Sequence, residues 1–444
     1  MAGRFSFADI STKLRRVAKL TREAPQMVWT TLAHQIDYRL LYYAFLHTRK
    51  DGATGVDGQT EQEYRKGLEG RLRSLLDRFK SGSYRAPAVR RTYIRKDDGK
   101  SKRPIGIPTF EDKILQRAVA MVLGAVYEQD FLDCSYGFRP GRSVHQALEA
   151  LWKGLMDMKG GVVLEVDIRS FFDSLEHEHL RAILDQRVRD GVLRRMIDKW
   201  LKAGVLEDGE LSYPETGTPQ GGVISPLLAN IFLHEVLDRW FEQDVKPRLE
   251  AKAFMIRYAD DLVMVFASER DANRVMAVLP KRLEKHGLNI HPDKTRLVRF
   301  RRPYLQQPTS GQGSFDFLGF THFWARSRKG TWVVKRKTSD KRFARAIKSI
   351  YQWCRKNRHL KVAEQHRVLV RKLKGHCAFY GITGNSPILD RFRHELLRVW
   401  RKWLNRRDQR RRMPWDRFNK LLERYALPPA HAIHSVLRSA AARP

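Results

Sequence analysis

The chain has 444 residues, of which 42% are hydrophobic, so it contains enough apolar material for a buried core and is not a disordered polymer. Its 85 lysines and arginines outnumber its 49 aspartates and glutamates, which gives a formal net charge of +36 at pH 7. Because so large a charge repels itself and favours a polyanionic partner, we predict a nucleic-acid-binding protein and keep a membrane surface as the weaker alternative.

The sequence lacks signals for secretion or membrane insertion. The longest nearly apolar stretch, which begins at Ala118, is about half of the roughly 20 residues that a spanning helix requires. The N-terminus has no signal-peptide core. The three cysteines, Cys134, Cys354 and Cys377, lie far apart and form no CxxC pair. We therefore expect a soluble intracellular protein, without membrane contact, whose cysteines are free thiols.

Helical patterns dominate the chain from residue 10 to residue 85, interrupted by a turn segment rich in glycine and aspartate. Residues 89–108 predict two short basic strands joined by a turn, and residues 112–129 predict a buried helix. The short, β-branched apolar run at residues 160–168 predicts a strand.

Capping signals mark the helices of the middle of the chain. Asp173 and Glu176 resemble the capping residues of the helix that follows them. Residues 217–222 form a glycine-rich loop, GTPQGG. Ser225 and Pro226 then stand where the N-cap and the first residue of an apolar helix are expected.

Two apolar strands, at residues 253–258 and 262–268, are separated by three residues and predict a hairpin. Residues 303–314 are polar and predict a loop, and residues 315–337 predict the strands that close this part of the chain. Beyond about Thr338 the composition is helical, aromatic and basic, so we expect a domain boundary there.

The hairpin tip contains the sequence YADD, with adjacent carboxylates at Asp260 and Asp261. Both flanking strands are apolar on both faces, so these charges lie close to a core and need a partner, for which divalent cations are the usual choice. Asp167 ends another apolar strand, and strand-end carboxylates that converge would hold two Mg²⁺ ions. We interpret Asp173, which lies nearby, as a helix cap instead of a ligand.

The sequence then resembles a known family. Seven blocks, between about Leu32 and Tyr380, follow the order found in group II intron reverse transcriptases: RPIGIP, CSYGFRPGRSVHQAL, VDIRSFFD, GTPQGGVISPLLANIFL, YADD, LNIHPDKT and FDFLGF. The resemblance implies an α+β right-hand polymerase, whose fingers and palm contain an antiparallel palm sheet and precede an all-helical thumb, or X domain. The implied divisions are residues 1–90 (helical extension and start of the fingers), 91–335 (fingers and palm), 336–405 (thumb, or maturase domain) and 406–444 (basic DNA-binding segment).

The resemblance also implies roles for single residues. Asp167 and Asp260 match the two metal-binding aspartates, and Asp261 is the partner of Asp260 in YADD. Phe172 matches an aromatic steric gate whose ring would collide with a ribose 2′-hydroxyl. The competing interpretation makes Phe172 a core residue, and Phe171 is the alternative candidate for the inner position. For the basic residues, a general basic surface is the competing interpretation. The further matches are Lys96, Arg103, Gln220 and Lys294 as nucleotide-binding residues, and Arg139, Arg142, Arg398, Arg401, Arg406 and Arg407 as nucleic-acid-binding residues.

The resemblance implies an RNA-directed DNA polymerase in a bacterial cytoplasm or nucleoid, with intron RNA, DNA primer or target and dNTPs as partners. It would copy intron RNA into DNA for retrohoming and assist splicing as a maturase. No Cys/His cluster follows the thumb, so we expect no HNH endonuclease and no cleavage of the second DNA strand. Three alternatives remain: a splicing-only RNA-binding maturase, a domesticated reverse transcriptase in defence or DNA repair, and an RNA-templated RNA polymerase, which Phe172 disfavours.

Overall fold

The computed structural model describes residues 7–95, 102–207, 209–213, 217, 221–303, 313–407 and 413–434. None of the helices in these ranges is long and apolar enough to cross a membrane. The chain forms two compact units. Unit 1 comprises Met1–Ser143, Val166–Leu262 and Arg270–Arg296, and unit 2 comprises Val144–Glu165, Val263–Glu269 and Leu297–Pro444.

The N-terminal part of unit 1 is helical, as its periodicity predicted. Helix α5 is its centre, since α1 and α2 both pack against it and Ile114, Ala118 and Val122 are completely buried. The Thr109 side chain caps α5 by accepting a hydrogen bond from the backbone N–H of Asp112. The helices are α1 (Phe7–Glu23), η1 (Ala33–Gln35), α2 (Tyr38–His47), α3 (Glu61–Arg65), α4 (Leu68–Ser81) and α5 (Phe110–Tyr127).

The two basic strands predicted at residues 89–108 are present as β1 (Val89–Arg95) and β2 (Lys102–Ile107), which pair antiparallel. They belong to a four-stranded sheet with the order β2-β1-β4-β5, where β4 is Val205–Glu207 and β5 is Glu210–Ser212. Strands β1 and β4 run parallel. This pairing joins segments more than a hundred residues apart, and the sequence pattern did not predict it.

Two predicted caps are wrong by a few residues. The helix that follows β3 (Gly160–Asp167) and a short helical turn begins at His177. Its N-cap residue is Glu176, whose side chain makes no capping hydrogen bond, and Asp173 lies in the preceding short helix. The helix after the glycine-rich loop has Ile224 as N-cap, so Ser225 is its first residue. The helices of this region are α7 (Phe171–Ser174), α8 (His177–Asp185), α9 (Gly191–Leu201), α10 (Ser225–Leu233), η2 (His234–Asp238), η3 (Trp240–Val245), η4 (Lys246–Arg248) and α11 (Glu269–Glu284).

The apolar helix predicted from Pro226 onward changes its winding. After α10, the segments η2 and η3 are π-helical, with one extra residue in each hydrogen-bonded turn. Such turns are rare and are frequently found at functional sites. Here they direct Asp238 into the protein interior, where it is fully buried.

The predicted apolar strands form a second four-stranded sheet with the order β6-β7-β3-β8. Glycines at the start of β3 permit close strand contacts, because a Cβ on Gly160 would lie 2.0 Å from the carbonyl oxygen of Phe300 and one on Gly161 would lie 2.3 Å from that of Phe266. The strands are β3 (Gly160–Asp167), β6 (Ala253–Tyr258), β7 (Asp261–Phe266) and β8 (Arg296–Arg301).

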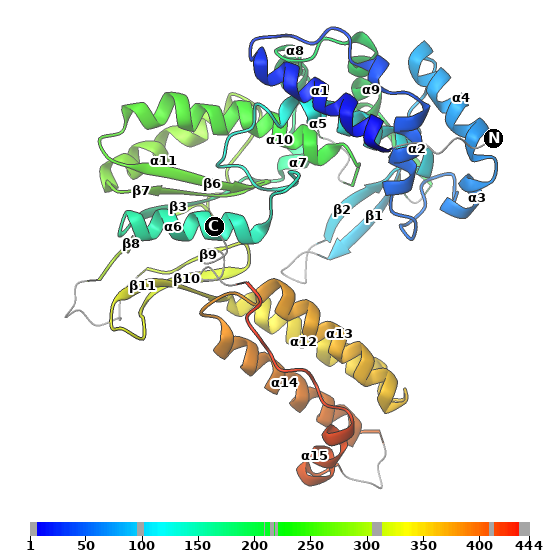
Figure 1. The fold of residues 1–444 in the computed structure, drawn as a ribbon. Helices are drawn as coiled ribbons and strands as arrows, with labels where there is room; N and C mark the ends of the chain where they lie inside the picture. Colours follow the sequence, from blue (N-terminus) through cyan, green and yellow to red (C-terminus); the bar gives the residue numbers. More distant parts are fainter. Residues whose placement is uncertain are drawn as a thin grey trace. The chain divides into compact units, whose positions relative to one another are not determined.

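Unit 2 also contains an antiparallel three-stranded sheet and a helical part with its own apolar core, around Leu373, Phe392 and Trp400. Helices α12, α13 and α14 run alongside one another there (Figure 1). The predicted polar loop at 303–314 falls largely outside the described residues. The elements are α6 (Val144–Asp157), β9 (Phe315–Phe317), β10 (Phe320–Arg326), β11 (Trp332–Thr338), α12 (Asp340–Lys356), α13 (Val362–Tyr380), α14 (Ser386–Asn405) and α15 (Trp415–Arg424).

Candidate active site

The YADD segment forms the tight turn between β6 and β7. Ala259 has a φ of 57°, in the left-handed region, and Asp260 follows it in the turn. A non-glycine residue in this region costs about 1–3 kcal/mol, so surrounding contacts must hold it there. Strand β7 is buried from Leu262 onward, while Asp261 itself is exposed. The expected hairpin inside a core is therefore present.

Asp167 lies at the end of β3, next to a short antiparallel pairing between Ile168 and Ile290. The backbone N–H of His291 donates to the carbonyl oxygen of Asp167 at 2.7 Å. The same segment supplies Lys294, whose Nζ lies 3.4 Å from Oδ2 of Asp167. The PDKT block thus places a cation beside the first of the predicted aspartates.

Asp260 and Asp167 are close enough for their charges to interact. Burial raises the pKa of the Asp260 carboxyl, the Asp260 backbone N–H and the charge of Arg103 lower it, and the charge of Asp167 raises it further. Arg103 lies on β2, opposite Ile94 of β1. Two carboxylates and two cations from four separate segments, Asp167, Asp260, Arg103 and Lys294, therefore share one electrostatic environment.

These carboxylates fit a hard divalent cation. Burial and the neighbouring Asp167 carboxylate both disfavour the ionised form of the half-buried Asp260 carboxyl. A bound cation would stabilise that ionised form, and hard divalent ions prefer oxygen ligands. Within the described ranges, however, no group of three or more His, Cys, Asp or Glu side chains is assembled for a metal ion. Asp261 stays exposed at the start of β7.

The two phenylalanines after Asp167 occupy different environments. Phe171 is 2% exposed and packs near Phe232, with ring centroids 6.3 Å apart. Phe172 is half-buried and meets Phe171 edge to face at 5.1 Å. Of the two candidates for the inner position, Phe171 is therefore the buried one, and the steric-gate role of Phe172 stays a prediction.

The described ends of the glycine-rich loop lie against this same region. A Cβ on Gly217 would lie 2.9 Å from the carbonyl oxygen of Phe172, and one on Gly221 would lie 2.5 Å from that of Gly106 on β2. Both glycines have positive φ, of 89° and 113°. The loop therefore approaches both the Phe172 segment and β2 closely, for which glycine is needed. Lys96 and Gln220 lie outside the described residues.

A buried chain of hydrogen bonds contacts the backbone directly after the glycine-rich loop, at Val223 and Ile224. Oε1 of Gln116 accepts hydrogen bonds from the backbone N–H groups of Val223 and Ile224 at 2.7 and 3.4 Å, and Nε2 of Gln116 donates to Asp112. The Asp112 carboxylate also accepts from Tyr84 and Trp200. No sequence motif pointed to Asp112 or Gln116, because their roles depend on contacts with distant segments.

Asp112 should make stability depend on pH. Burial raises the pKa of its carboxyl from 3.8 to about 6 in the folded state, so between these values the unfolded chain releases a proton that the folded chain retains. Stability should therefore fall by about 2 kcal/mol as the pH rises from about 4 to about 6, and the decline should be complete near pH 7, at about 3 kcal/mol in all. Urea unfolding across this range should show the decline in the wild type relative to Asp112→Asn.

The exposed Asp133 supplies the control for this prediction, since its side chain is 95% exposed. Asp133→Asn should keep the same pH trend as the wild type. A constant stability difference between the wild type and Asp112→Asn from pH 4 to pH 7 would contradict the raised pKa.

The basic residues after α5 lie in different surroundings. Arg139 is buried, and its guanidinium donates to Glu128 and to the carbonyl oxygens of Leu132 and Ser135. Arg142 is partly exposed and pairs with Asp133. The hydrogen-bonding groups of Arg139 are thus directed into the protein, and a nucleic-acid contact by it stays a prediction.

Unit 2 gathers cations and aromatic rings around a cavity of about 460 Å³. Arg401 lies over the Trp415 ring at 4.2 Å, and Arg406 lies over Trp403 at 5.3 Å. Arg398 is exposed and pairs with Glu395. Arg407 is exposed near the end of α14 and donates to the carbonyl oxygen of His359. The cavity lining includes Tyr351, Arg398, Arg401, Lys402, Arg406 and Trp415.

Comparison with known proteins identifies the class to which this fold and site belong. Residues 94–322 match the family described as "Reverse transcriptase (RNA-dependent DNA polymerase)", which is more than half of the chain. The chain therefore belongs to the reverse transcriptase family, whose members use divalent metal ions. Its relatives place it more narrowly, among group II intron-encoded reverse transcriptases and maturases.

Three relatives illustrate this placement. The group II intron-encoded protein LtrA of Lactococcus lactis subsp. cremoris is 38% identical over 236 residues, 52% of this chain but only 38% of LtrA. Protein YkfC of Escherichia coli is 32% identical over 352 residues, 72% of this chain and 86% of that protein. Nuclear intron maturase 2 of Arabidopsis thaliana mitochondria is 32% identical over 222 residues, 39% of this chain and 30% of that protein.

Proposed function

We propose that this protein is an RNA-directed DNA polymerase of a group II intron, which copies intron RNA into DNA for retrohoming. The observation that carries the proposal is the convergence of the Asp167 and Asp260 carboxylates with Arg103 and Lys294 in a reverse transcriptase chain. Phosphoryl transfer to a primer needs negative ligands for metal ions and positive charge around a triphosphate, and these residues supply both.

Asp167, Asp260 and Asp261 would hold the metal ions, for which two Mg²⁺ are the proposed set. Such ions supply activation of the attacking 3′-hydroxyl and charge stabilisation of the triphosphate. The protein holds Asp260 in a strained turn and Asp167 at a strand end, so both carboxylates are fixed before substrate arrives. Lys294 would stabilise the leaving pyrophosphate from its position beside Asp167.

The incoming nucleotide would lie between β2 and the Phe172 segment. Arg103 and Lys96 would contact its triphosphate, and Gln220 of the glycine-rich loop would lie beside it. The close approach of Gly217 to the Phe172 carbonyl and of Gly221 to β2 supports this placement. These residues fall within the proposed fingers and palm, residues 91–335, which follow a helical extension at 1–90.

Sugar selection by Phe172 is testable. Phe172→Ala should raise the ratio of ribonucleotide to deoxynucleotide incorporation by about 10–100-fold, because removal of the ring makes room for the 2′-hydroxyl. The measurement is single-nucleotide extension with dNTP and rNTP in parallel. Phe171→Leu is the matched control, since its side chain is buried and should alter stability without altering sugar choice. If both variants changed the ratio of ribonucleotide to deoxynucleotide incorporation equally, the Phe172 ring would have a packing role and would not select the sugar.

A maturase role is proposed for the same chain on the basis of its unit 2 cavity. Guanidinium groups over tryptophan rings offer both phosphate contacts and base stacking, which suits RNA. In this proposal residues 336–405 form the thumb and residues 406–444 a basic DNA-binding segment. The relative named as an intron maturase supports the splicing role.

The experiment that tests the proposed function is primer extension on an RNA template with Mg²⁺ and dNTPs. Extension that stops on chelation of the metal supports the polymerase. Tight RNA binding without extension would favour the splicing-only maturase instead. Extension by a protein whose gene is not flanked by a structured intron RNA would favour the domesticated enzyme in defence or DNA repair.

A further inference from the structure

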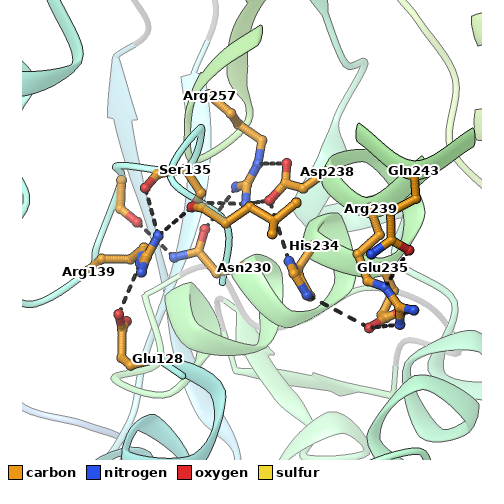
Figure 2. A network of polar contacts seen from close by, with 12 residues as sticks. Glu128, Ser135, Arg139, Asn230, His234, Glu235, Asp238, Arg239, Gln243 and Arg257 are labelled. Atoms are coloured by element: carbon orange, nitrogen blue, oxygen red, sulfur yellow. Dashed lines mark hydrogen bonds and ion pairs between the residues drawn. The ribbon is translucent and has the colours of Figure 1, made fainter. Parts of the chain in front are cut away.

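The strand that leads into the YADD turn, β6, contains a buried arginine, Arg257, one residue before its end. Arg257 and Asp238 are both completely buried and form a bidentate ion pair, in which Nε and Nη2 of Arg257 donate to the two carboxylate oxygens at 2.7 and 2.5 Å (Figure 2). Asp238 comes from the π-helical segment η2, nineteen residues earlier in the chain. The pair therefore ties β6 to that helix.

The remaining donors of the Arg257 guanidinium reach three further groups. Nη2 donates to Oγ of Ser135 at 2.8 Å, and Nη1 donates to Oδ1 of Asn230 at 2.9 Å and to the carbonyl oxygen of Ala259 at 3.0 Å. A guanidinium has five N–H groups, and all five are used here. The last of these bonds ends on the strained residue directly before Asp260.

Asn230 connects the arginine to a second support of the turn. Its Nδ2 donates to the carbonyl oxygen of Gly137 at 2.7 Å. The Cα of Gly137 lies so near the turn that a Cβ there would be 2.3 Å from the backbone nitrogen of Ala259. Arg257 thus holds the carbonyl of Ala259 by a hydrogen bond, Gly137 packs closely against the backbone nitrogen of Ala259, and Asn230 bonds to both Arg257 and Gly137.

We propose that Arg257 is a positioning residue, whose guanidinium, oriented by Asp238, fixes the Ala259 carbonyl and thereby the direction of the Asp260 carboxylate. The inference rests on the proposed function, since it assigns the network a role at the same site. Stability alone does not explain a buried Arg257–Asp238 pair. Burying two charges costs desolvation free energy, and apolar side chains of similar volume often stabilise a core as well or better. The specific gain is a fixed hydrogen bond to a strained backbone.

Lysine cannot replace this arginine. Its ammonium has three donors on a flexible chain, whereas the five contacts require the planar guanidinium fork. Arg257→Lys keeps the charge beside Asp238 but cannot reach Asn230, Ser135 and the Ala259 carbonyl together. The Arg257→Lys variant therefore tests the loss of the positioning hydrogen bonds while the positive charge is kept.

The chain offers a matched control at Arg187. This arginine is also buried, pairs in bidentate fashion with Asp130 and donates to the carbonyl oxygens of Met27 and Thr21. Its bonds end far along the chain from the YADD turn, so Arg187→Lys should carry a comparable loss of stability without a direct effect on Asp260.

The test compares both variants with the wild type in three measurements: melting temperature, Mn²⁺ binding to the full-length protein by electron paramagnetic resonance, and steady-state primer extension. We expect Arg257→Lys to lower Mn²⁺ affinity by about 10–100-fold, as is typical when a group that orients a metal ligand is lost. Its kcat should fall by about 10²-fold, with KM for dNTP changed by less than about threefold. Arg187→Lys should leave Mn²⁺ affinity and kcat near the wild-type values at a similar melting temperature.

Equal Mn²⁺ affinity in Arg257→Lys and the wild type would overturn the inference, as would equal losses of kcat in both variants at equal melting temperature. Should Arg257→Lys not fold, Asn230→Ala carries the test, since it removes the link to Gly137 and should lower Mn²⁺ affinity in the same direction. Absence of extension by the wild type would count against the proposed polymerase, while the Mn²⁺ measurement would still decide the role of Arg257.

Discussion

Asp260→Ala should abolish DNA synthesis while leaving RNA affinity and its salt dependence nearly unchanged. The carboxylate would be a ligand of the catalytic ions, whose stabilisation of transition-state charge contributes several kcal/mol, so a loss of at least about 10³-fold in kcat is expected. RNA binding depends on the lysines and arginines of a chain with a net charge of +36, to which one aspartate contributes little. Primer extension and salt-dependent RNA binding, measured on the same preparation, check both parts.

Asp51→Ala is the control for this variant. Asp51 is exposed and forms a surface ion pair with Arg49 in the described part of the chain, so its loss should leave synthesis at the wild-type rate. Normal extension by Asp260→Ala would remove Asp260 from the metal site. A large drop in RNA affinity would mean that the carboxylate, or the ions it holds, takes part in holding the RNA.

Gly137→Ala should cost about 10²-fold in kcat, because the new Cβ would collide with the backbone of the YADD turn and displace Asp260. The distances to the backbone nitrogen of Ala259 and the carbonyl carbon of Tyr258 would be 2.3 and 2.9 Å. Since backbone atoms cannot move aside as a flexible side chain can, we also expect a loss of about 1–3 kcal/mol in unfolding free energy. Primer extension and urea unfolding measure the two effects.

Gly124→Ala is the matched substitution elsewhere in unit 1. Gly124 lies inside α5 and an added Cβ would meet nothing within 4 Å, so alanine should stabilise the protein by up to about 1 kcal/mol and leave kcat unchanged. If Gly137→Ala retained wild-type kcat, the YADD turn would tolerate a backbone displacement that its close contacts should forbid. The proposed positioning role of Arg257 would then lose support.

The strands that carry the aspartates were predictable because their residues repeat a local pattern. The apolar runs ending at Asp167 and flanking YADD are buried strands in the structure. The helical nature of residues 10–85 and of the chain beyond Thr338 followed in the same way from periodicity. The caps at Asp173 and Ser225 were misplaced, since a capping residue depends on the backbone path of the turn before it as well as on residue type.

In the candidate site, too, the features encoded in neighbouring residues were predictable and those that depend on the fold were not. The sequence alone predicted Asp167, Asp260, Asp261 and Phe172 as site residues, because each lies in a contiguous block of residues that can be recognised without the fold. It could not select between the interior and exterior positions of the arginines. Arg139 proved to be buried against Glu128, whereas Arg398 and Arg406 face the cavity of unit 2.

By itself, then, the sequence determined the family, the apolar strands and the acidic residues at their ends, since each is written in neighbouring residues. Only the tertiary structure decided which groups support them. Arg257 meets Asp238, Asn230, Ser135 and Ala259, and Gln116 meets the backbone of Val223, through contacts between segments up to 122 residues apart. Such contacts leave no periodic trace in a single chain, because their geometry arises only when buried donors and acceptors must all find partners in the folded core.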